Sequence, residues 1–311
     1  MSEETYRLVT RSDFDGLVCA MLLRQVGLID KDILFVHPKD MQDGKVEITG
    51  RDITTNLPFV EGVHLAFDHH HSERIRVGAD KPNYVCDPEA PSAARVVFDY
   101  YGGASRFPNI APDMMVAVDK ADSAQFSRED ILEPKGWDLL SFLMDARTGL
   151  GRFHDFRISN YQLMMECIDY CLTHGAEQTL ALPDVKERVD LYLGSQEKFI
   201  EQIRRCSTVH EKLVVLDLRN EETIWPGNRF MIYALFPETN ISIHVIWGKQ
   251  KQNTVFAVGH SILDRSSRTD VGELMLSFAG GGHKAAGTCQ VENERAEAVL
   301  GELIELINED G

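Results

Sequence analysis

Apolar runs separated by polar segments predict an alternating α/β structure for the first part of the chain. Short apolar runs at 6–10, 33–36 and 62–67 are typical of buried strands, and 46–48 is a weaker candidate for a third strand. A longer apolar run at 17–23 stops before a glycine and predicts a helix. Strands that alternate with helices and end in polar residues indicate an open parallel sheet.

The pattern changes twice further along the chain. Residues 137–210 are helical in pattern, with a connecting helix near 189–203. Strand-like runs and two further helices then follow: strands at 213–216, 231–235, 241–246, 254–258 and 287–292, and helices at 270–278 and 294–308. We therefore expect an N-terminal domain over 1–185, a helical connector over 186–210 and a smaller C-terminal α/β domain over 211–311.

Composition and charge limit the partners. The 311 residues include 32 basic and 49 acidic side chains, so the net charge is −17, and 43% of residues are hydrophobic. Such a chain folds, but it lacks the broad basic face that grips long nucleic acid. A small anionic substrate is still compatible with it if metals or a few arginines supply positive charge. No apolar run is long enough to span a membrane, and the acidic N-terminus and scattered cysteines favour a cytoplasmic protein.

Acidic and histidine side chains gather where predicted strands end. Asp13 and Asp15 follow the first strand, and the run Asp68-His69-His70-His71 follows the strand at 62–67. Helix capping could explain the first pair alone. Four consecutive ionisable groups after an apolar strand are costly unless a cation pairs with them. Carboxylates together with imidazoles suit a divalent metal ion.

Further acidic residues extend this set. Asp52 lies near another predicted strand end, and Asp119 and Asp122 follow the apolar run 114–118. Each of them alone could be a turn or capping residue. In this order along the chain, the acidic and histidine residues supply enough ligands for two metals with a bridging carboxylate. That arrangement serves in-line displacement at phosphorus.

These motifs resemble the DHH phosphoesterases. The signature is Asp68-His69-His70, and the segment 280–287, Gly-Gly-Gly-His-Lys-Ala-Ala-Gly, resembles the glycine-rich signature of the DHH-associated C-terminal domain. The two signatures and the acidic motifs together cover essentially the whole chain. The resemblance implies a two-domain phosphoesterase that uses Mn²⁺, with its active site in the cleft between an N-terminal parallel-sheet domain and the C-terminal domain.

The resemblance also implies roles for individual residues. Asp68, His69 and His70 form the catalytic motif, in which His70 contacts the substrate or relays a proton. The implied metal ligands are Asp13, Asp15, Asp52, His69 and Asp122, with Asp119 as the alternative to Asp122 and Asp52 as the bridging ligand. Val9 stands where many members carry a histidine ligand, a departure that the RecJ-type exonucleases share. One or two Mn²⁺ ions are therefore expected, and His71 is a candidate substitute ligand.

The predicted substrate-binding residues lie in the C-terminal domain. Arg265 and Arg268 can bind phosphate with their guanidinium groups. Gly281 and Gly282 would let backbone N–H groups approach a phosphate, and His283 can donate to the same anion. The segment 147–152 is another polar loop that contains arginines, but a plain surface loop explains it better.

The expected activity is hydrolysis of phosphodiester bonds in small nucleotides, namely cyclic or linear dinucleotides or short oligoribonucleotides. The alternatives within the same class are an exopolyphosphatase and a bisphosphonucleotide phosphatase. A non-catalytic nucleotide-binding module is a third hypothesis, because the C-terminal signature also resembles a tail of alanyl-tRNA synthetases. The acidic charge and the full set of metal-type residues argue against it. A homodimer is compatible with the sequence.

Overall fold

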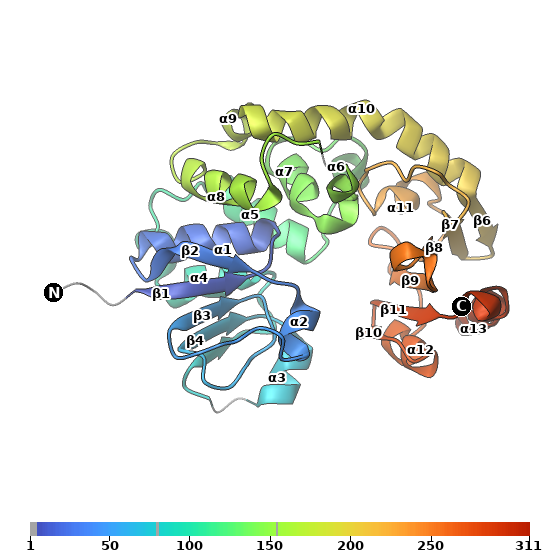
Figure 1. Cartoon of the computed structure of the whole chain (residues 1–311), viewed down its shortest axis with the longest axis horizontal. Coiled ribbons are helices and arrows are strands. Elements are labelled where there is room, and N and C mark those ends of the chain that lie inside the picture. The colour runs from blue at the N-terminus through green and yellow to red at the C-terminus, as the bar shows by residue number, and fades with distance from the viewer. Residues whose placement is uncertain (1–4, 79–80, 154) are drawn as a thin grey trace. The chain divides into compact units, whose positions relative to one another are not determined.

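The computed structural model describes residues 5–78, 81–153 and 155–311, and the chain divides into two compact units (Figure 1). The first unit consists of Met1–Gln125 and Pro134–Leu191. The second consists of Phe126–Glu133 and Tyr192–Gly311. Each unit is built around its own sheet.

The first unit contains a five-stranded parallel sheet in the order β2-β1-β3-β4-β5. Its strands are β1 (Tyr6–Thr10), β2 (Ile29–Phe35), β3 (Asp52–Thr55), β4 (Leu65–Asp68) and β5 (Tyr84–Cys86). The expected parallel α/β sheet is thus confirmed. The predicted strand at 46–48 is wrong, because the third strand begins at Asp52. All four residues of β3 are buried, so this central strand has no apolar–polar alternation to reveal it.

Helices surround this sheet. They are α1 (Phe14–Gln25), α2 (Pro38–Gln42), α3 (His71–Val77), α4 (Ala93–Tyr100), α5 (Pro112–Asp122), α7 (Gly136–Met144), α8 (Asn160–Tyr170) and α9 (Ala176–Leu180). Residues 14–23 of α1 are all buried, and this helix packs against α4, α5 and α8. A helix that is apolar on every side is stable only inside a core. Its buried N-terminus therefore fixes the acidic residues that begin it.

The helix α10 (Pro183–Cys206) carries the chain from the first unit into the second. The second unit also includes α6 (Arg128–Leu132), although the sequence predicts residues 126–133 in the first domain. The ring of Phe126 lies 5.8 Å from that of Phe230, and Arg128 donates to the carbonyl of Ala234 at 3.2 Å. These tertiary contacts join segments about a hundred residues apart, which local patterns cannot show.

The second unit contains a six-stranded mixed sheet in the order β10-β11-β9-β8-β7-β6. Its strands are β6 (Ser207–His210), β7 (Leu213–Asp217), β8 (Ile241–Trp247), β9 (Thr254–His260), β10 (Gly281–His283) and β11 (Ala286–Val291). Only β7 and β8 pair in parallel among these described strands. Apolar residues of α12 (Val271–Ser277) and α13 (Ala296–Asp310) complete its core, as expected for a smaller α/β domain.

One predicted strand of the second unit is a helix. Residues 231–235 form α11 (Met231–Leu235), in which the first four side chains are buried. The side chain of Asn228 accepts a hydrogen bond from the N–H of Phe230 at 2.8 Å just before the helix begins. A short, fully buried apolar run does not distinguish a strand from a helix, which explains the error.

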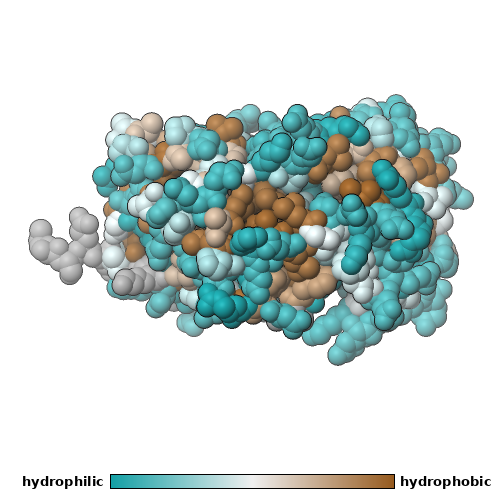
Figure 2. Space-filling view, turned by 90° about the horizontal axis from the view of Figure 1, so that it is seen from above, coloured by the Kyte–Doolittle hydropathy of each residue, from teal (hydrophilic) through white to brown (hydrophobic). Residues whose placement is uncertain are grey.

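Hydrophilic residues cover much of the face shown in Figure 2. Within the described ranges, no helix combines the length and apolar character needed to cross a membrane.

Candidate active site

The end of β1 and the start of α1 place the first two acidic residues. Asp13 is the N-cap of α1, and its carboxylate accepts a hydrogen bond from the N–H of Gly16 at 3.0 Å. Its other oxygen lies 3.0 Å from Nε of Arg11. A Cβ atom at position 16 would lie 2.0 Å from the Arg11 carbonyl oxygen, so only glycine lets the helix begin this close to the strand. Both oxygens of Asp13 therefore have partners.

Asp15 lies in the first turn of α1 and is only 2% exposed. One carboxylate oxygen accepts a hydrogen bond from the N–H of Ala94 at 2.8 Å. The other, Oδ2, is buried and has no hydrogen-bond partner among the described residues. A buried carboxylate oxygen without a partner is costly in a folded protein. This oxygen is therefore available for a cation.

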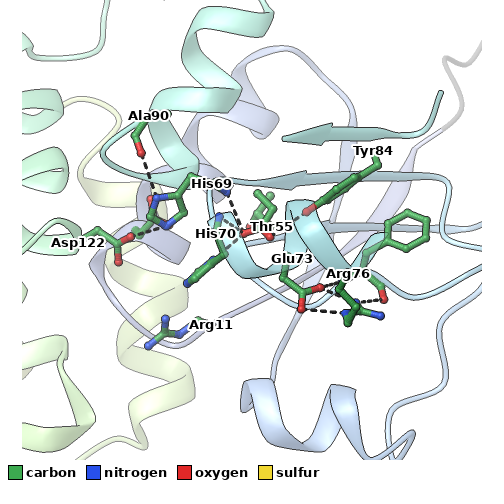
Figure 3. A network of polar contacts seen from close by, with 12 residues as sticks. Arg11, Thr55, His69, His70, Glu73, Arg76, Tyr84, Ala90 and Asp122 are labelled. Carbon is green, nitrogen blue, oxygen red and sulfur yellow. Dashed lines mark hydrogen bonds and ion pairs between the residues drawn. The ribbon is translucent and has the colours of Figure 1, made fainter. Parts of the chain in front are cut away.

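His69 follows β4 and faces the same site (Figure 3). Its Nδ1 lies 3.2 Å from the carbonyl oxygen of Ala90, and its Nε2 lies 2.7 Å from Oδ2 of Asp122 at the end of α5. A carbonyl can only accept a hydrogen bond, so Nδ1 carries a proton. Histidines that bind metals are usually held in this way, with the second ring nitrogen left as the ligand atom.

Ligand atoms of Asp15, His69 and Asp122 all lie within 4.8 Å of one another. Burial raises the pKa of Asp15 well above its usual range, and the charges of Asp122 and Asp13 add to that effect. Burial alone would lower the pKa of His69, but its contact with Asp122 raises it to about 9. The crowded carboxylates thus favour a positive charge between them. Two carboxylates and one imidazole are ligands that fit a divalent transition metal.

Asp68 and His70 form a pair beside this cluster. Asp68 is fully buried, and its carboxylate accepts hydrogen bonds from Nδ1 of His70 at 2.7 Å and from the hydroxyl of Tyr84 at 3.2 Å. The His70 side chain remains 43% exposed. Asp68 therefore orients His70, and both of its carboxylate oxygens have partners. His71 is exposed at the start of α3 and lies outside the cluster of described ligand atoms.

Asp119, the alternative to Asp122, lies elsewhere. Its carboxylate accepts hydrogen bonds from Nε of Arg95 at 3.0 Å and from the hydroxyl of Ser92 at 2.8 Å. Asp119 thus ties α5 to α4. The geometry favours Asp122 as the residue of this segment that faces the cluster.

Comparison with known proteins places this geometry in a family. No protein-family profile matches the chain, and no curated protein does. Among solved structures, the pGpG-specific phosphodiesterase PggH from Vibrio cholerae is 61% identical over 99% of this chain and 100% of its own, with a TM-score of 0.86. The chain belongs to the DHH phosphoesterase family. The resemblance that the sequence motifs indicate is thereby confirmed.

Two more distant structures share the fold of this DHH phosphoesterase. RecJ from Thermus thermophilus, solved with Mn²⁺, is 15% identical over 99% of this chain and 53% of its own, with a TM-score of 0.53. An exopolyphosphatase-related protein from Bacteroides fragilis is 13% identical over 97% of this chain and 92% of its own, with a TM-score of 0.51. At these identities the likeness concerns the fold alone.

Asp52 does not lie with the other acidic residues of this DHH phosphoesterase, in contrast to its predicted role as bridging ligand. It begins β3, where the register sets it opposite Arg7 near the amino end of β1. Its carboxylate accepts hydrogen bonds from Nε of Arg7 and from the N–H of Thr49, both at 2.7 Å. The metal-type cluster lies at the opposite, carboxyl end of the sheet. Asp52 therefore pairs with Arg7 and lies apart from the cluster.

Replacing Asp52 with asparagine is expected to lower the free energy of unfolding by about 1–3 kcal/mol, because a charged partner of Arg7 is lost. Arg7 holds the pKa of Asp52 below its usual value despite burial, so this stabilisation is present at neutral pH and is lost on acidification. Urea unfolding and a Mn²⁺ titration check both parts. Weaker metal binding with unchanged stability would return Asp52 to the ligand set.

Two residues that the sequence did not single out also face the cluster end of the sheet. Asn56 follows β3, is 1% exposed, adopts a φ of 55°, and neither polar atom of its amide has a described hydrogen-bond partner. Arg11 pairs with Asp13. Burial raises the pKa of Asp122, but His69, with a smaller contribution from Arg11, lowers it below its usual value. The sequence prediction considers only acidic residues and histidines at strand ends, so it cannot identify an asparagine or an arginine there.

The predicted substrate-binding arginines lie in the second unit. Arg265 and Arg268 are both exposed in the segment between β9 and α12. Nε of Arg265 lies 3.4 Å from the carbonyl oxygen of Ile262, and the guanidinium of Arg268 lies against Gly311. Nδ1 of His283 accepts a hydrogen bond from the N–H of Ala285 at 3.3 Å.

The glycine run is not the open loop that the sequence suggests, because Gly281–His283 form strand β10 and pair with β11. A Cβ atom at Gly282 would lie 2.4 Å from the carbonyl oxygen of Ala286, so close strand packing requires this glycine. A Cβ atom at Gly281 would meet no atom within 4 Å. Of these two glycines, only Gly281 has room for a Cβ atom.

Proposed function

We propose that this DHH phosphoesterase hydrolyses the phosphodiester bond of small linear dinucleotides such as pGpG, and that it does so with Mn²⁺. The observation that carries the substrate is the 61% identity to PggH along the whole chain. The cluster of Asp15, His69 and Asp122 supports the chemistry, since these three side chains offer ligand atoms within 4.8 Å of one another.

Asp15 Oδ2, His69 Nε2 and Asp122 Oδ2 are the atoms that would hold the ion. When bound, a divalent metal lowers the pKa of water and neutralises charge on a phosphoryl group. The Ala90 carbonyl keeps a proton on Nδ1 of His69, so that Nε2, which faces Asp122, would be the ligand atom. The mixed oxygen and nitrogen donors favour Mn²⁺ over Ca²⁺, which prefers an all-oxygen site.

His70 is placed for proton transfer. Water adds its oxygen to phosphorus, the bond from phosphorus to the ribose 3′ oxygen breaks, and that leaving oxygen must take up a proton. Asp68 accepts a hydrogen bond from Nδ1 of His70 and orients the ring, which remains accessible. We assign His70 as the general acid and Asp68 as the residue that positions it.

The second unit supplies candidate groups for the rest of the substrate. Arg265, Arg268 and His283 are proposed to bind phosphate, and Gly281 to allow close backbone approach. Arg265 and Arg268 are two positive charges on a chain with a net charge of −17. They suit one or two phosphates, so the base and ribose must contribute through apolar and hydrogen-bonding contacts.

Gly281→Ala and Gly282→Ala form a matched pair that tests the role of the glycine strand. The alanine at 281 meets open space, so stability should be unchanged while KM for pGpG rises. The alanine at 282 meets the backbone of β11 and should destabilise the protein by about 1–3 kcal/mol. Thermal unfolding and steady-state kinetics separate the two effects. An unchanged KM in Gly281→Ala would remove this glycine from the substrate site.

A substrate panel with added Mn²⁺ tests the proposed function. It compares pGpG, cyclic dinucleotides, a short oligoribonucleotide and a 3′,5′-bisphosphonucleotide by chromatography of the products. We expect pGpG to give two molecules of 5′-GMP and to have the highest kcat/KM. A higher kcat/KM for the bisphosphonucleotide or for a cyclic dinucleotide would contradict the assignment.

A further inference from the structure

The carboxylates at the metal cluster balance one divalent ion. Asp15 keeps one buried oxygen without a described partner, and Asp122 faces it from α5. Asp13 is already paired with Arg11 at 3.0 Å and caps α1. Asp68 uses both of its oxygens to hold His70 and Tyr84. Among the described residues, Asp15 and Asp122 are the two carboxylates that offer clustered ligand atoms, and their combined charge matches that of a single divalent metal.

Asn56 directly follows β3 beside this cluster, at the position from which a ligand for a second metal ion would have to come. The parallel register continues past Thr55 and Phe67, so Asn56 lies next to Asp68, and its N–H donates to the Phe67 carbonyl at 3.1 Å. On the other side, Thr55 hydrogen-bonds to Thr10 of β1. Asn56 therefore sits between the two strand ends that carry the site. Its buried amide, without a described partner, adds no negative charge there.

Val9 and Arg11 complete this edge of the site. Val9 is fully buried in an apolar cluster and cannot bind a metal. Arg11 is 28% exposed on its side chain, so it can still meet a ligand while Asp13 holds its Nε. Figure 3 shows the Arg11 guanidinium on the side of the site where Asp122 and His70 lie.

From these contacts we infer that the site holds one divalent metal and that Arg11, while it pairs with Asp13 through Nε, donates hydrogen bonds from its terminal nitrogens to the scissile phosphate. The guanidinium offers fixed N–H donors that match phosphate oxygens, and it performs the charge stabilisation that a second metal provides elsewhere. Asn56 keeps the space beside it neutral and offers an amide donor to the same phosphate. This inference rests on the proposed function, since it assigns a role in phosphodiester hydrolysis.

Metal counting and kinetics on the full-length protein test the inference together. Titration with Mn²⁺ followed by electron paramagnetic resonance should give one ion per chain, with the spectrum of an isolated ion. Arg11→Gln should still bind one ion but lose about 10²–10³-fold in kcat for pGpG. Arg11→Lys should recover part of that loss. Arg157→Gln is the matched control, because Arg157 also pairs with an aspartate of the first unit, Asp184, and should leave both values unchanged.

A double variant tests why a second ion is excluded. Arg11→Ala with Asn56→Asp removes a cation and adds a carboxylate, so the count should rise to two ions per chain with a spin-coupled spectrum. The inference is overturned by two ions of similar affinity in the wild type, by Arg11→Gln within threefold of wild-type kcat, or by a double variant that still binds one ion. A wild type that binds one ion but cleaves no dinucleotide would instead contradict the proposed function.

Discussion

Replacing Asp122 with alanine is expected to abolish hydrolysis, with a loss on the order of 10³-fold or more in kcat/KM for pGpG. Asp122 contributes one of three clustered ligand atoms and is the partner of His69. Its removal deprives the cation of a carboxylate and releases the ring that the Ala90 carbonyl orients. Mn²⁺ affinity, measured by calorimetry, should fall together with activity.

Asp119→Ala is the matched control three residues earlier on the same helix. It removes the acceptor of Arg95 and Ser92, so it should lower the melting temperature while Mn²⁺ affinity and kcat remain close to wild type. The opposite order, with Asp119→Ala inactive and Asp122→Ala active, would show that the wrong face of α5 has been assigned to the site.

Inorganic polyphosphate should be a poor substrate, with kcat/KM at least about 10²-fold below that of pGpG. Polyphosphate is a dense polyanion, and binding several of its units requires a continuous basic track. The chain carries a net charge of −17, and the candidate phosphate-binding arginines are two residues, Arg265 and Arg268, which do not amount to a long basic track. A dinucleotide depends less on charge because its bases and riboses offer other contacts. A kcat/KM for polyphosphate above that for every dinucleotide tested would contradict this assignment.

The fold of the first unit could be predicted largely because its signals are local. The strand at 6–10 and the helix that contains 17–23 lie where the apolar runs indicate them. Two errors share one cause: β3 is buried throughout, and so is most of α11, so neither shows the alternation or helical stripe that identifies an element. The grouping of residues 126–133 with the second unit depends on tertiary contacts and has no local signal.

The site was predictable where its residues are ionisable and follow a strand. The sequence indicates Asp15, His69 and Asp122, and the structure brings their ligand atoms together. Asp52 was predicted as a metal ligand because the sequence does not show where β3 lies. It begins this strand, whereas the prediction placed it at a strand end. Once β3 is known to end at Thr55, the next residue, Asn56, becomes the candidate, but its neutral amide gives no signal of metal chemistry.

The central proposal is that a metal held by Asp15, His69 and Asp122 enables the first unit to cleave a dinucleotide. The most direct test is the rate of 5′-GMP release from pGpG before chelation, in excess chelator, and after Mn²⁺ is restored. We expect turnover to stop in chelator and to return with Mn²⁺, but not with Ca²⁺. Undiminished turnover in excess chelator would contradict a metal-dependent site and, with it, the assignment of these three residues.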